Sequence, residues 1–290
     1  MKPTIFITRK LPDNVIQKYF PHFNIKMWDK EDIPVPRAIL LDEVQQADGL
    51  VTMLSDQIDK EVMTAGNRLK VIANLAVGFD NIDIQSATDS GIAVCNTPDI
   101  LTDTTADLTF SLLMATSRRL IEAAEFVKAG NWKSWSPLLL AGHDVHHKTI
   151  GIVGMGKIGE TVAKRATGFD MNILYHNRSR KPEVEVALGA QYVSFNELVE
   201  QADFIVCLTP LTNETHHLFT REVFQKMKNS AIFINASRGP VADERALFDA
   251  LVNKEIAGAG LDVFDVEPIA ADYPLLKLDQ VVALPHIGSS

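Results

Sequence analysis

The sequence predicts an α/β fold in which two doubly wound domains are built on parallel sheets. Three observations support this prediction. Short runs rich in Val and Ile alternate with segments of helical period along the whole chain. The runs are continuously apolar rather than alternating, which is typical of strands that helices cover on both faces. A glycine-rich turn also joins one run to a helical segment, as in layered α/β folds.

The apolar runs give the expected strands in order. In the first third of the chain they are IFIT, IKMW, LVTM, VIANLA and IAVCNT. Later they are TIGIVG, NILYHN, FIVCLT, AIFINAS, AGLDVF and VVALP. Helical patterns cover 157–168, 195–201 and 243–254. The longest helical pattern runs from about Thr104 to about Ala129, and Gly130 follows it as the expected C-cap. Residues 1–98 and 99–286 are therefore expected to form two domains.

Composition narrows the class of protein. The chain has 290 residues, of which 46% are hydrophobic and 22% charged, as in globular proteins. A net charge of −9 argues against nucleic-acid or anionic-membrane partners, because either needs a basic face. No apolar run reaches the length of a membrane span, and the N-terminus lacks signal-peptide features. Cys95 and Cys207 are expected to be two buried, reduced thiols, which favours a cytoplasmic protein.

A glycine-rich turn marks the start of the second domain's helical layer. The segment GIVGMGKIGETVAKRA contains Gly154-x-Gly156-x-x-Gly159 directly after a strand and at the start of a helix. Gly154 would permit the tight turn, Gly156 the approach of a pyrophosphate, and Gly159 close packing of helix on strand. The helix N-terminus at Lys157 and Ile158 would offer N–H groups to the phosphates. The alternative is a glycine turn without a ligand. The pattern favours a Rossmann-like dinucleotide site.

The next strand predicts which dinucleotide is preferred. In a domain that prefers NAD, an acidic residue ends this strand and binds the ribose hydroxyls. Here the strand NILYHN ends at Asn177, 18 residues after Gly159, and Arg178, Ser179 and Arg180 follow. Arginines pair with a 2′-phosphate, which a carboxylate would repel. We therefore expect NADP(H) to be preferred, with NAD(H) possible. The alternative is a solvated basic turn.

Three polar residues follow three later strands. Arg238 lies in AIFINASRG, Glu267 in LDVFDVEP and His286 in VVALPHIG. Parallel strands deliver such residues to one edge of the sheet, where ligands bind. A ketone that accepts hydride needs a proton donor, and histidine suits that task. A neighbouring carboxylate would favour the protonated imidazole, and a guanidinium would bind and polarise a 2-oxo acid.

Four ordered motifs carry a resemblance to a known family. NASRG, GAGLDVFDVEP and LPHIGS, together with TIGIVGMGKIGETVAKRA, resemble the NAD(P)-dependent D-2-hydroxyacid dehydrogenases. Within that family the chain is most similar to the reductases of glyoxylate, hydroxypyruvate and 2-ketogluconate. NLAVGFDNID and NTPDILTDTTAD extend the resemblance over nearly the whole chain. It implies that Arg238 anchors the substrate, that Glu267 holds the histidine, and that His286 is the general acid and base.

The resemblance also implies contacts outside this triad. The backbone amides of Val77 and Gly78 would hold the substrate carboxylate, and Leu54 would line that pocket. Asp262 would bind the nicotinamide amide. Three further residues would line the cofactor: Thr105, Thr209 and the backbone of Ala236.

A Trp-bearing loop resembles the family's dimerisation segment. It contains Trp132 and Trp135, and Trp135 would reach the partner subunit's substrate pocket in a homodimer. The alternative for both tryptophans is ordinary core packing. In the family a further segment follows the catalytic histidine and completes the first domain. The resemblance therefore implies a C-terminal segment beyond this chain.

Other interpretations carry less support. His143 and His147 lie four residues apart, but glycine before them and a strand after them indicate a turn, so we expect no metal site. A non-catalytic dinucleotide-sensing regulator is the rival function, and it would be expected to have lost the triad. A formate dehydrogenase would carry a longer N-terminal region.

Overall fold

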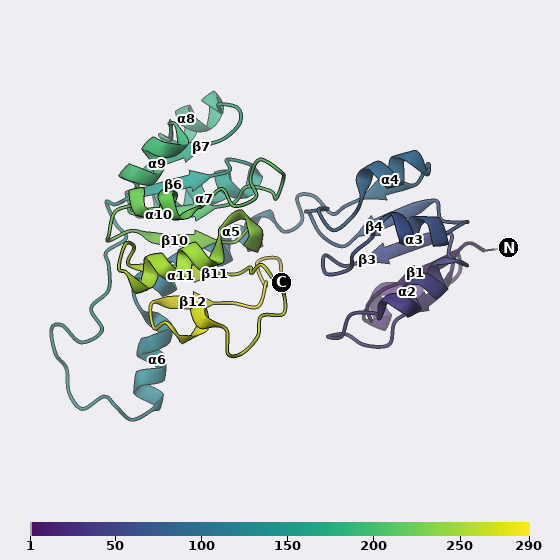
Figure 1. Ribbon diagram of the computed structural model, residues 1–290, viewed down its shortest axis with the longest axis horizontal. Coiled ribbons are helices and arrows are strands. Elements are labelled where there is room, and N and C mark those ends of the chain that lie inside the picture. Colours follow the sequence, from purple (N-terminus) through teal and green to yellow (C-terminus); the bar gives the residue numbers. More distant parts are fainter. Residues whose placement is uncertain (1) are drawn as a thin grey trace. The chain divides into compact units, whose positions relative to one another are not determined.

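The computed structural model of the protein describes residues 2–290. The chain divides into two compact units, Met1–Ile100 and Leu101–Ser290. The first unit is drawn in purple and blue in Figure 1, and the second in teal, green and yellow. The boundary proposed from the sequence, after residue 98, lies two residues earlier than this division.

The first unit is a five-stranded parallel sheet in the order β2-β1-β3-β4-β5. All five strands expected in this part of the sequence are present. They are β1 (Thr4–Ile7), β2 (Asn24–Met27), β3 (Gly49–Thr52), β4 (Val71–Asn74) and β5 (Ala93–Cys95). The helices are α1 (Asp13–Ile16), η1 (Gln17–Tyr19), α2 (Arg37–Val44), α3 (Lys60–Ala65) and α4 (Ile84–Asp89). Reversal of the strand order next to β1 is typical of flavodoxin-like sheets.

The second unit is a seven-stranded parallel sheet in the order β12-β11-β10-β9-β6-β7-β8. Its strands are β6 (Thr149–Val153), β7 (Asn172–His176), β8 (Gln191–Tyr192), β9 (Phe204–Cys207), β10 (Ile232–Asn235), β11 (Gly258–Leu261) and β12 (Val281–Ala283). This is the Rossmann order, with the reversal between β6 and β9. The prediction missed β8 alone, because an exposed two-residue strand carries no apolar pattern.

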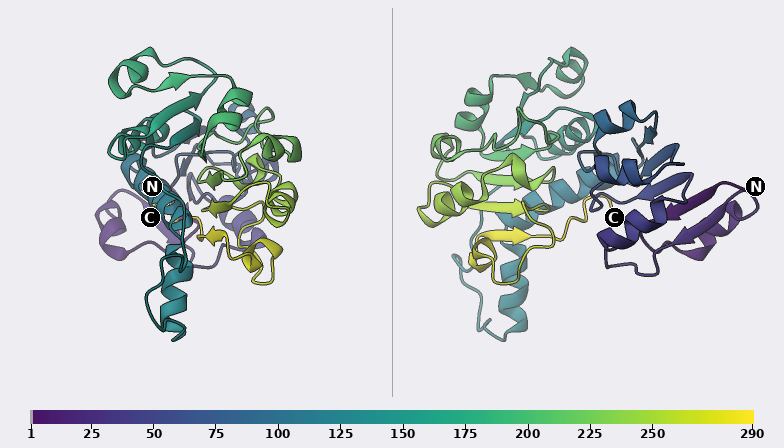
Figure 2. Two further views of the ribbon diagram at one scale, coloured as in Figure 1. Left: turned by 90° about the vertical axis from the view of Figure 1, so that its left-hand side faces the viewer. Right: turned by 45° about the vertical axis from the view of Figure 1, so that its right-hand side comes forward.

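Helices cover both faces of this second sheet (Figure 2). On one face α5 (Thr102–Ser117) packs on α7 (Lys157–Thr167), and on the other α10 (Arg221–Lys226) packs on α9 (Phe195–Gln201) and α11 (Glu244–Val252). The remaining elements are α6 (Leu120–Lys128), α8 (Pro182–Leu188), η2 (Gly239–Val241) and η3 (Pro274–Lys277). The near-continuous burial of the strands explains their unbroken apolar sequences.

The prediction of one helix from about 104 to about 129 is wrong. Helix α5 ends at Ser117, and Arg119 adopts a left-handed φ of 53° before α6 begins. The carbonyl of Ser117 accepts a hydrogen bond from the distant N–H of His143 at 2.8 Å. This tertiary contact replaces a helical bond where no proline or glycine marks a break. The expected end at Gly130 is confirmed by its φ of 70°.

The prediction of two buried thiols is half wrong. Both cysteines are free, but Cys207 is buried whereas Cys95 is exposed. Cys207 ends the central strand β9, which has neighbours on both sides. Cys95 ends β5 at the edge of the first sheet, where fewer neighbours cover it. An apolar flanking sequence alone does not distinguish these two positions.

Candidate active site

The glycine-rich turn connects β6 to α7, as predicted. Gly154 adopts φ 101°, and a Cβ atom added there would lie 2.7 Å from the carbonyl carbon of Leu208. A Cβ atom at Gly159 would lie 2.3 Å from the carbonyl oxygen of Gly154, so helix and strand pack closely. A Cβ atom at Gly156 would meet no heavy atom within 4 Å. The turn therefore leaves open space above its middle glycine, where a side chain would stand.

This turn also presents the N-terminus of α7. No side chain caps the helix at Gly156. The helical hydrogen bonds begin with the N–H of Glu160, which donates to the carbonyl of Gly156 at 2.9 Å. The backbone of Thr209, after β9, lies beside Gly154. A helix N-terminus with a partial positive charge and an uncovered glycine fits the pyrophosphate of a dinucleotide.

The end of β7 holds one of the two predicted phosphate-binding arginines in an ion pair. Arg180 contacts Glu185 through Nε–Oε1 at 2.7 Å and Nη2–Oε2 at 2.6 Å. This hydrogen-bonded pair is the main cause that lowers the pKa of the Glu185 carboxyl. The buried hydroxyl of Tyr175 donates to Glu185 and accepts the N–H of Lys181, at 2.8 and 2.6 Å. The turn is thus ordered by a carboxylate six residues beyond Ser179.

The other residues of this turn are placed differently. The Asn177 side chain donates to the carbonyl of Ser179 at 3.0 Å, and the Asn177 backbone carbonyl accepts the Tyr192 hydroxyl at 3.3 Å. Arg178 is exposed. Of the two arginines, Arg178 is therefore the one whose guanidinium is not held by Glu185.

A histidine–carboxylate pair lies at the carboxyl edge of the second sheet. The Nδ1 atom of His286 is 2.7 Å from Oε2 of Glu267, and the two side chains are 19% and 31% exposed. The other Glu267 oxygen accepts the N–H of Phe264 at 2.9 Å. Burial, the largest influence, opposes ionisation of Glu267. The bonds from His286 and Phe264 and the charges of His286 and Arg238 outweigh it, so the Glu267 pKa is lowered.

Asp262 fixes the backbone that carries the histidine. Its carboxylate is 1% exposed, and its two oxygens accept the N–H groups of Ile287 and Gly288, each at 2.8 Å. His286 itself has a left-handed φ of 54°, which few non-glycine residues adopt. Burial raises the pKa of Asp262, and the two N–H bonds partly offset that effect. A Cβ atom at Gly288 would lie 2.9 Å from Oδ2 of Asp262, so a side chain here would displace the carboxylate.

Arg238 follows β10 in a turn that packs on the Glu267 loop. A Cβ atom at Gly239 would lie 1.9 Å from the backbone of Phe264, so the two loops touch. The buried Asn235 side chain, 1% exposed, donates to the carbonyl of Arg238 at 2.9 Å. The arrangement brings a guanidinium, a carboxylate and an imidazole to one edge of the sheet, from three different strands.

One buried hydroxyl in this region has no partner. The Oγ1 atom of Thr105 on α5 is buried and makes no hydrogen bond, and no other side-chain oxygen or nitrogen in residues 2–290 shares that condition. Its methyl and hydroxyl groups lie close to Gly288, next to the Asp262 carboxylate. An unpaired buried hydroxyl is costly unless a ligand completes it. This observation fits a bound nicotinamide group, and Ala236 lies in the nearby β10 loop.

The residues predicted to bind a substrate carboxylate lie in the first unit. Val77 and Gly78 follow β4, and Leu54 follows β3. The Ala76 carbonyl accepts the N–H of Thr97, and the Val77 carbonyl accepts the Asn96 side chain, both at 2.9 Å. A trans peptide directs its N–H opposite to its carbonyl. The N–H groups of Val77 and Gly78 therefore point away from these partners, and neither donates to another described residue.

The two loop tryptophans do not pack in the core. Trp132 is 57% exposed and Trp135 is 78% exposed. Leu138 on the same loop is 81% exposed.

Within residues 2–290 no group of three or more His, Cys, Asp and Glu side chains is placed to hold a metal ion. No helix in that range has both the length and the apolar character to cross a bilayer.

Comparison with known proteins agrees with this geometry. Residues 110–288 match the family of D-isomer specific 2-hydroxyacid dehydrogenases, NAD binding domain. The glyoxylate reductase of Thermococcus onnurineus is 51% identical, over 100% of this chain and 87% of its own. The glyoxylate/hydroxypyruvate reductase B of Klebsiella pneumoniae is 46% identical, over 100% of this chain and 90% of its own.

The chain belongs to the D-2-hydroxyacid dehydrogenase family. An NADPH-dependent glyoxylate/hydroxypyruvate reductase from Sinorhizobium meliloti, solved with NADP and malonate, matches this dehydrogenase with a TM-score of 0.87. That structure is 30% identical and covers 100% of this chain and 88% of its own. The TT0316 protein from Thermus thermophilus matches with a TM-score of 0.91 and 43% identity, over 99% and 90% of the two chains.

Membership confirms the family, the fold class and the enzyme class predicted from the sequence. The dehydrogenase is an oxidoreductase with an NAD-binding domain, which contains the glycine-rich turn, Arg238, Glu267 and His286. This supports the catalytic interpretation over the dinucleotide-sensing regulator.

Sequence reasoning missed the buried polar residues that hold the site's loops. Asn74 ends β4 and Asn235 ends β10, with exposures of 2% and 1%. Each donates its amide to a carbonyl of the loop that follows, that of Gly78 or of Arg238, at 2.9 Å. A signal was available, since both VIAN and IFIN are apolar strands that end in asparagine.

Proposed function

We propose that this dehydrogenase reduces small 2-oxo acids to D-2-hydroxy acids, with His286 as the proton donor. The observation that carries the proposal is the 2.7 Å contact between His286 Nδ1 and Glu267 Oε2. Because Glu267 takes one ring nitrogen, Nε2 remains for the substrate oxygen. Relatives named glyoxylate reductase and glyoxylate/hydroxypyruvate reductase support this reaction class.

A bound nicotinamide cofactor would supply the hydride that the carbonyl carbon accepts. His286 donates its Nε2 proton to the oxygen as negative charge develops there. Glu267 holds the imidazole in place through the 2.7 Å contact at Nδ1, which leaves Nε2 for the proton transfer. Arg238 would bind the substrate's carboxylate and carbonyl oxygens and polarise the carbonyl.

The remaining substrate contacts follow from the same resemblance. The N–H groups of Val77 and Gly78 would bind the substrate carboxylate, and Leu54 would line the pocket beside it. Glyoxylate, hydroxypyruvate and 2-ketogluconate are the candidate substrates. A panel of these acids with NADPH and NADH would rank them by kcat/KM.

We also propose that NADPH is preferred and that NADH is accepted. The support is the absence of a carboxylate at Asn177 and the presence of two arginines after it. Because Arg180 pairs with Glu185, we assign the larger share of 2′-phosphate binding to Arg178. The cofactor's remaining contacts would come from Asp262 and from four backbone or side-chain positions: Thr105, Thr209, Ala236 and Ser179.

We further propose a homodimer formed through α6 and the loop that follows it. Trp132, Trp135 and Leu138 expose apolar surface there, and monomers seldom leave large apolar patches uncovered. In that dimer Trp135 would reach the partner's substrate pocket. Sedimentation should give twice the chain mass of 32.0 kDa, and a monomer at micromolar concentration would contradict the proposal.

The free cysteines support a cytoplasmic location.

The test of the proposed reaction is the His286→Ala variant. We expect kcat for 2-oxo acid reduction to fall about 10²- to 10⁴-fold, the usual contribution of general acid catalysis. NADPH binding, followed by cofactor fluorescence, should be unchanged. His22→Ala, which removes an exposed imidazole in the turn before β2, is the matched control. Full turnover in His286→Ala would refute the assignment.

A further inference from the structure

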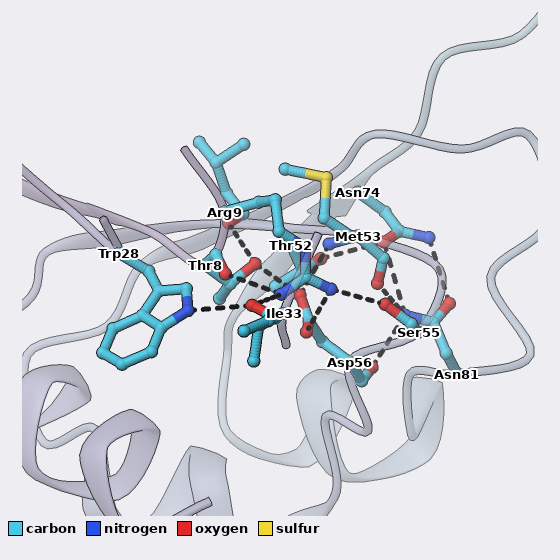
Figure 3. A network of polar contacts seen from close by, with 11 residues as sticks. Thr8, Arg9, Trp28, Ile33, Thr52, Met53, Ser55, Asp56, Asn74 and Asn81 are labelled. Atoms are coloured by element: carbon cyan, nitrogen blue, oxygen red, sulfur yellow. Dashed lines mark hydrogen bonds and ion pairs between the residues drawn. The ribbon is translucent and has the colours of Figure 1, made fainter. Parts of the chain in front are cut away.

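A buried polar network lies at the carboxyl ends of β1, β3 and β4 in the first unit (Figure 3). It joins two loops that are far apart in the sequence. The β3 loop comprises residues 53–58 and contains Leu54. The β4 loop comprises residues 75–81 and contains Val77 and Gly78. The spacing between these two loops matters because the proposed function gives both of them a part in substrate binding.

The Asn81 side chain contacts both the β3 loop and the strand that precedes the β4 loop. Its Nδ2 atom donates to the carbonyl of Met53 at 3.1 Å and to the carbonyl of Asp56 at 3.0 Å. These two carbonyls begin and end the turn that carries Leu54. The Asn81 Oδ1 atom accepts Asn74 Nδ2 at 3.1 Å. One amide group thus ties the turn of the β3 loop to the strand that leads into the β4 loop.

Asn74 extends this connection to the predicted carboxylate-binding backbone. It is 2% exposed, and its Nδ2 atom also donates to the carbonyl of Gly78 at 2.9 Å. Its Oδ1 atom accepts the Thr52 hydroxyl at 2.9 Å, which fixes the orientation of the amide. The path from Met53 and Asp56 through Asn81 and Asn74 to Gly78 therefore consists of hydrogen bonds in defined directions.

The far side of the β3 loop is held by Asp56. Its carboxylate accepts the N–H of Met53 at 2.8 Å and a short hydrogen bond from the hydroxyl of Thr8. Arg9 lies 3.7 Å from the other carboxylate oxygen and donates to Ser55 Oγ at 2.8 Å. The backbone also joins the two loops, because the N–H of Ile58 donates to the carbonyl of Asn81 at 2.9 Å. Asn81 is the side chain that links the turn at Met53 and Asp56 to the β4 loop.

We propose that Asn81 is a positioning residue for substrate binding, which it serves by fixing the β3 loop against the β4 loop. It touches neither the reacting atoms nor the cofactor. It sets the place of Leu54 relative to the N–H groups of Val77 and Gly78, so that the carboxylate of a 2-oxo acid meets preorganised donors. This inference rests on the proposed function, because that function supplies the substrate.

The chemistry of the amide explains why asparagine is needed. The groups around Asn81 Nδ2 are carbonyl oxygens, and all of them accept hydrogen bonds. An aspartate of the same shape would place a negative oxygen against them and reverse each interaction from attractive to repulsive. Asn81→Asp keeps the volume and removes the connection, whereas Asn81→Ala removes both.

The kinetic test compares Asn81→Ala and Asn81→Asp with the wild type, using glyoxylate and hydroxypyruvate. We expect KM to rise about 10- to 100-fold, because displaced binding groups cost affinity steeply, while kcat changes by less than about threefold. The Kd for NADPH should stay within about twofold. Asn67→Ala, an exposed asparagine in the turn before β4, is the matched control and should leave all three constants unchanged.

A second measurement reads the loops without a substrate. Hydrogen–deuterium exchange should accelerate in peptides covering 53–58 and 75–81 of both variants, with the rest of residues 2–100 unchanged. Acceleration spread evenly over that unit, or a KM within about twofold of wild type in both variants, would overturn the proposal. If the wild type reduces no 2-oxo acid, the proposed function fails. The exchange pattern then decides alone whether Asn81 joins the two loops.

Discussion

The two units contain the same kind of sheet, but the crevice at the carboxyl ends of the strands is filled in one and open in the other. In an open parallel sheet the crevice forms where the strand order reverses, at the carboxyl ends of the strands. In the second unit that point lies between β6 and β9, and Gly156 leaves open space there. In the first unit it lies between β1 and β3, where Asp56 is buried with 5% exposure.

The difference shows that the strand order determines where a crevice forms, whereas the side chains determine whether it is filled. In the first unit the Asp56 carboxylate takes up the donors that a ligand could otherwise bind, namely the Met53 N–H and the Thr8 hydroxyl. In the second unit the glycine turn has no such side chain, and the N-terminus of α7 has no cap. Asp56 fills the crevice between β1 and β3 of the first sheet, while the crevice between β6 and β9 of the second sheet stays open to an external anion.

The largest expected effect tests the closed crevice. Asp56→Ala should lower the free energy of unfolding of the first unit by about 3 kcal/mol, because it leaves a nearly buried Arg9 without its carboxylate and removes two hydrogen bonds. Urea unfolding, followed by hydrogen exchange of peptides from residues 2–100, measures this loss. Asp42→Ala, at an exposed site on α2, is the control. An equally stable Asp56→Ala variant would show that the carboxylate does not hold the crevice.

The next effect tests the open crevice. Gly156→Val should weaken NADPH and NADH binding about 100-fold, which is about 2.7 kcal/mol, by filling the pyrophosphate space. Its melting temperature should change little, because the Cβ atom of the new side chain meets no heavy atom within 4 Å. Gly159→Val should lower both the cofactor affinity and the melting temperature, since its Cβ atom would lie 2.3 Å from the Gly154 carbonyl oxygen. Unchanged cofactor binding in Gly156→Val would mean that the crevice is not the dinucleotide site.

A smaller effect concerns charge at the rim of the open crevice. Arg178→Ala should reduce kcat/KM for NADPH about tenfold, the lower range for a solvent-screened charge-assisted bond, and leave NADH unchanged. Arg180→Ala should cost less, because Glu185 already pairs with its guanidinium. The experiment compares both cofactors in both variants at low and high salt. A larger loss in Arg180→Ala would reverse our assignment of the two arginines.

The smallest expected effect is the pH dependence of the carboxylate at the second sheet's edge. Because the Glu267 pKa is lowered in the folded protein, its ionised form stabilises the fold above its ordinary value near 4.5. That contribution is lost as the pH falls through the lower, folded value. The stability difference between wild type and Glu267→Gln should therefore shrink as the pH drops below about 4.5. A difference that stays constant between about pH 6 and about pH 3 would contradict this linkage.

Within the second unit, much of the architecture could be predicted from local patterns. The strand before Gly154, the helix after it and the strand that ends at His176 all follow from apolar runs and glycine spacing. Such patterns record backbone and burial requirements of neighbouring residues. They do not record which side chains meet across the fold, and for that reason the residue roles at the candidate site remain proposals.

By itself the sequence determined the strands, the glycine turn, the family motifs and the edge of the sheet to which Arg238, Glu267 and His286 belong. Only the tertiary structure decided the break at Arg119, the exposure of Cys95 and the asparagine links that hold the loops. The physical reason is the same in each case. A strand or a turn is fixed by residues adjacent in the chain. By contrast, the carbonyl of Ser117 or the amide of Asn81 takes its partner from a segment more than twenty residues away.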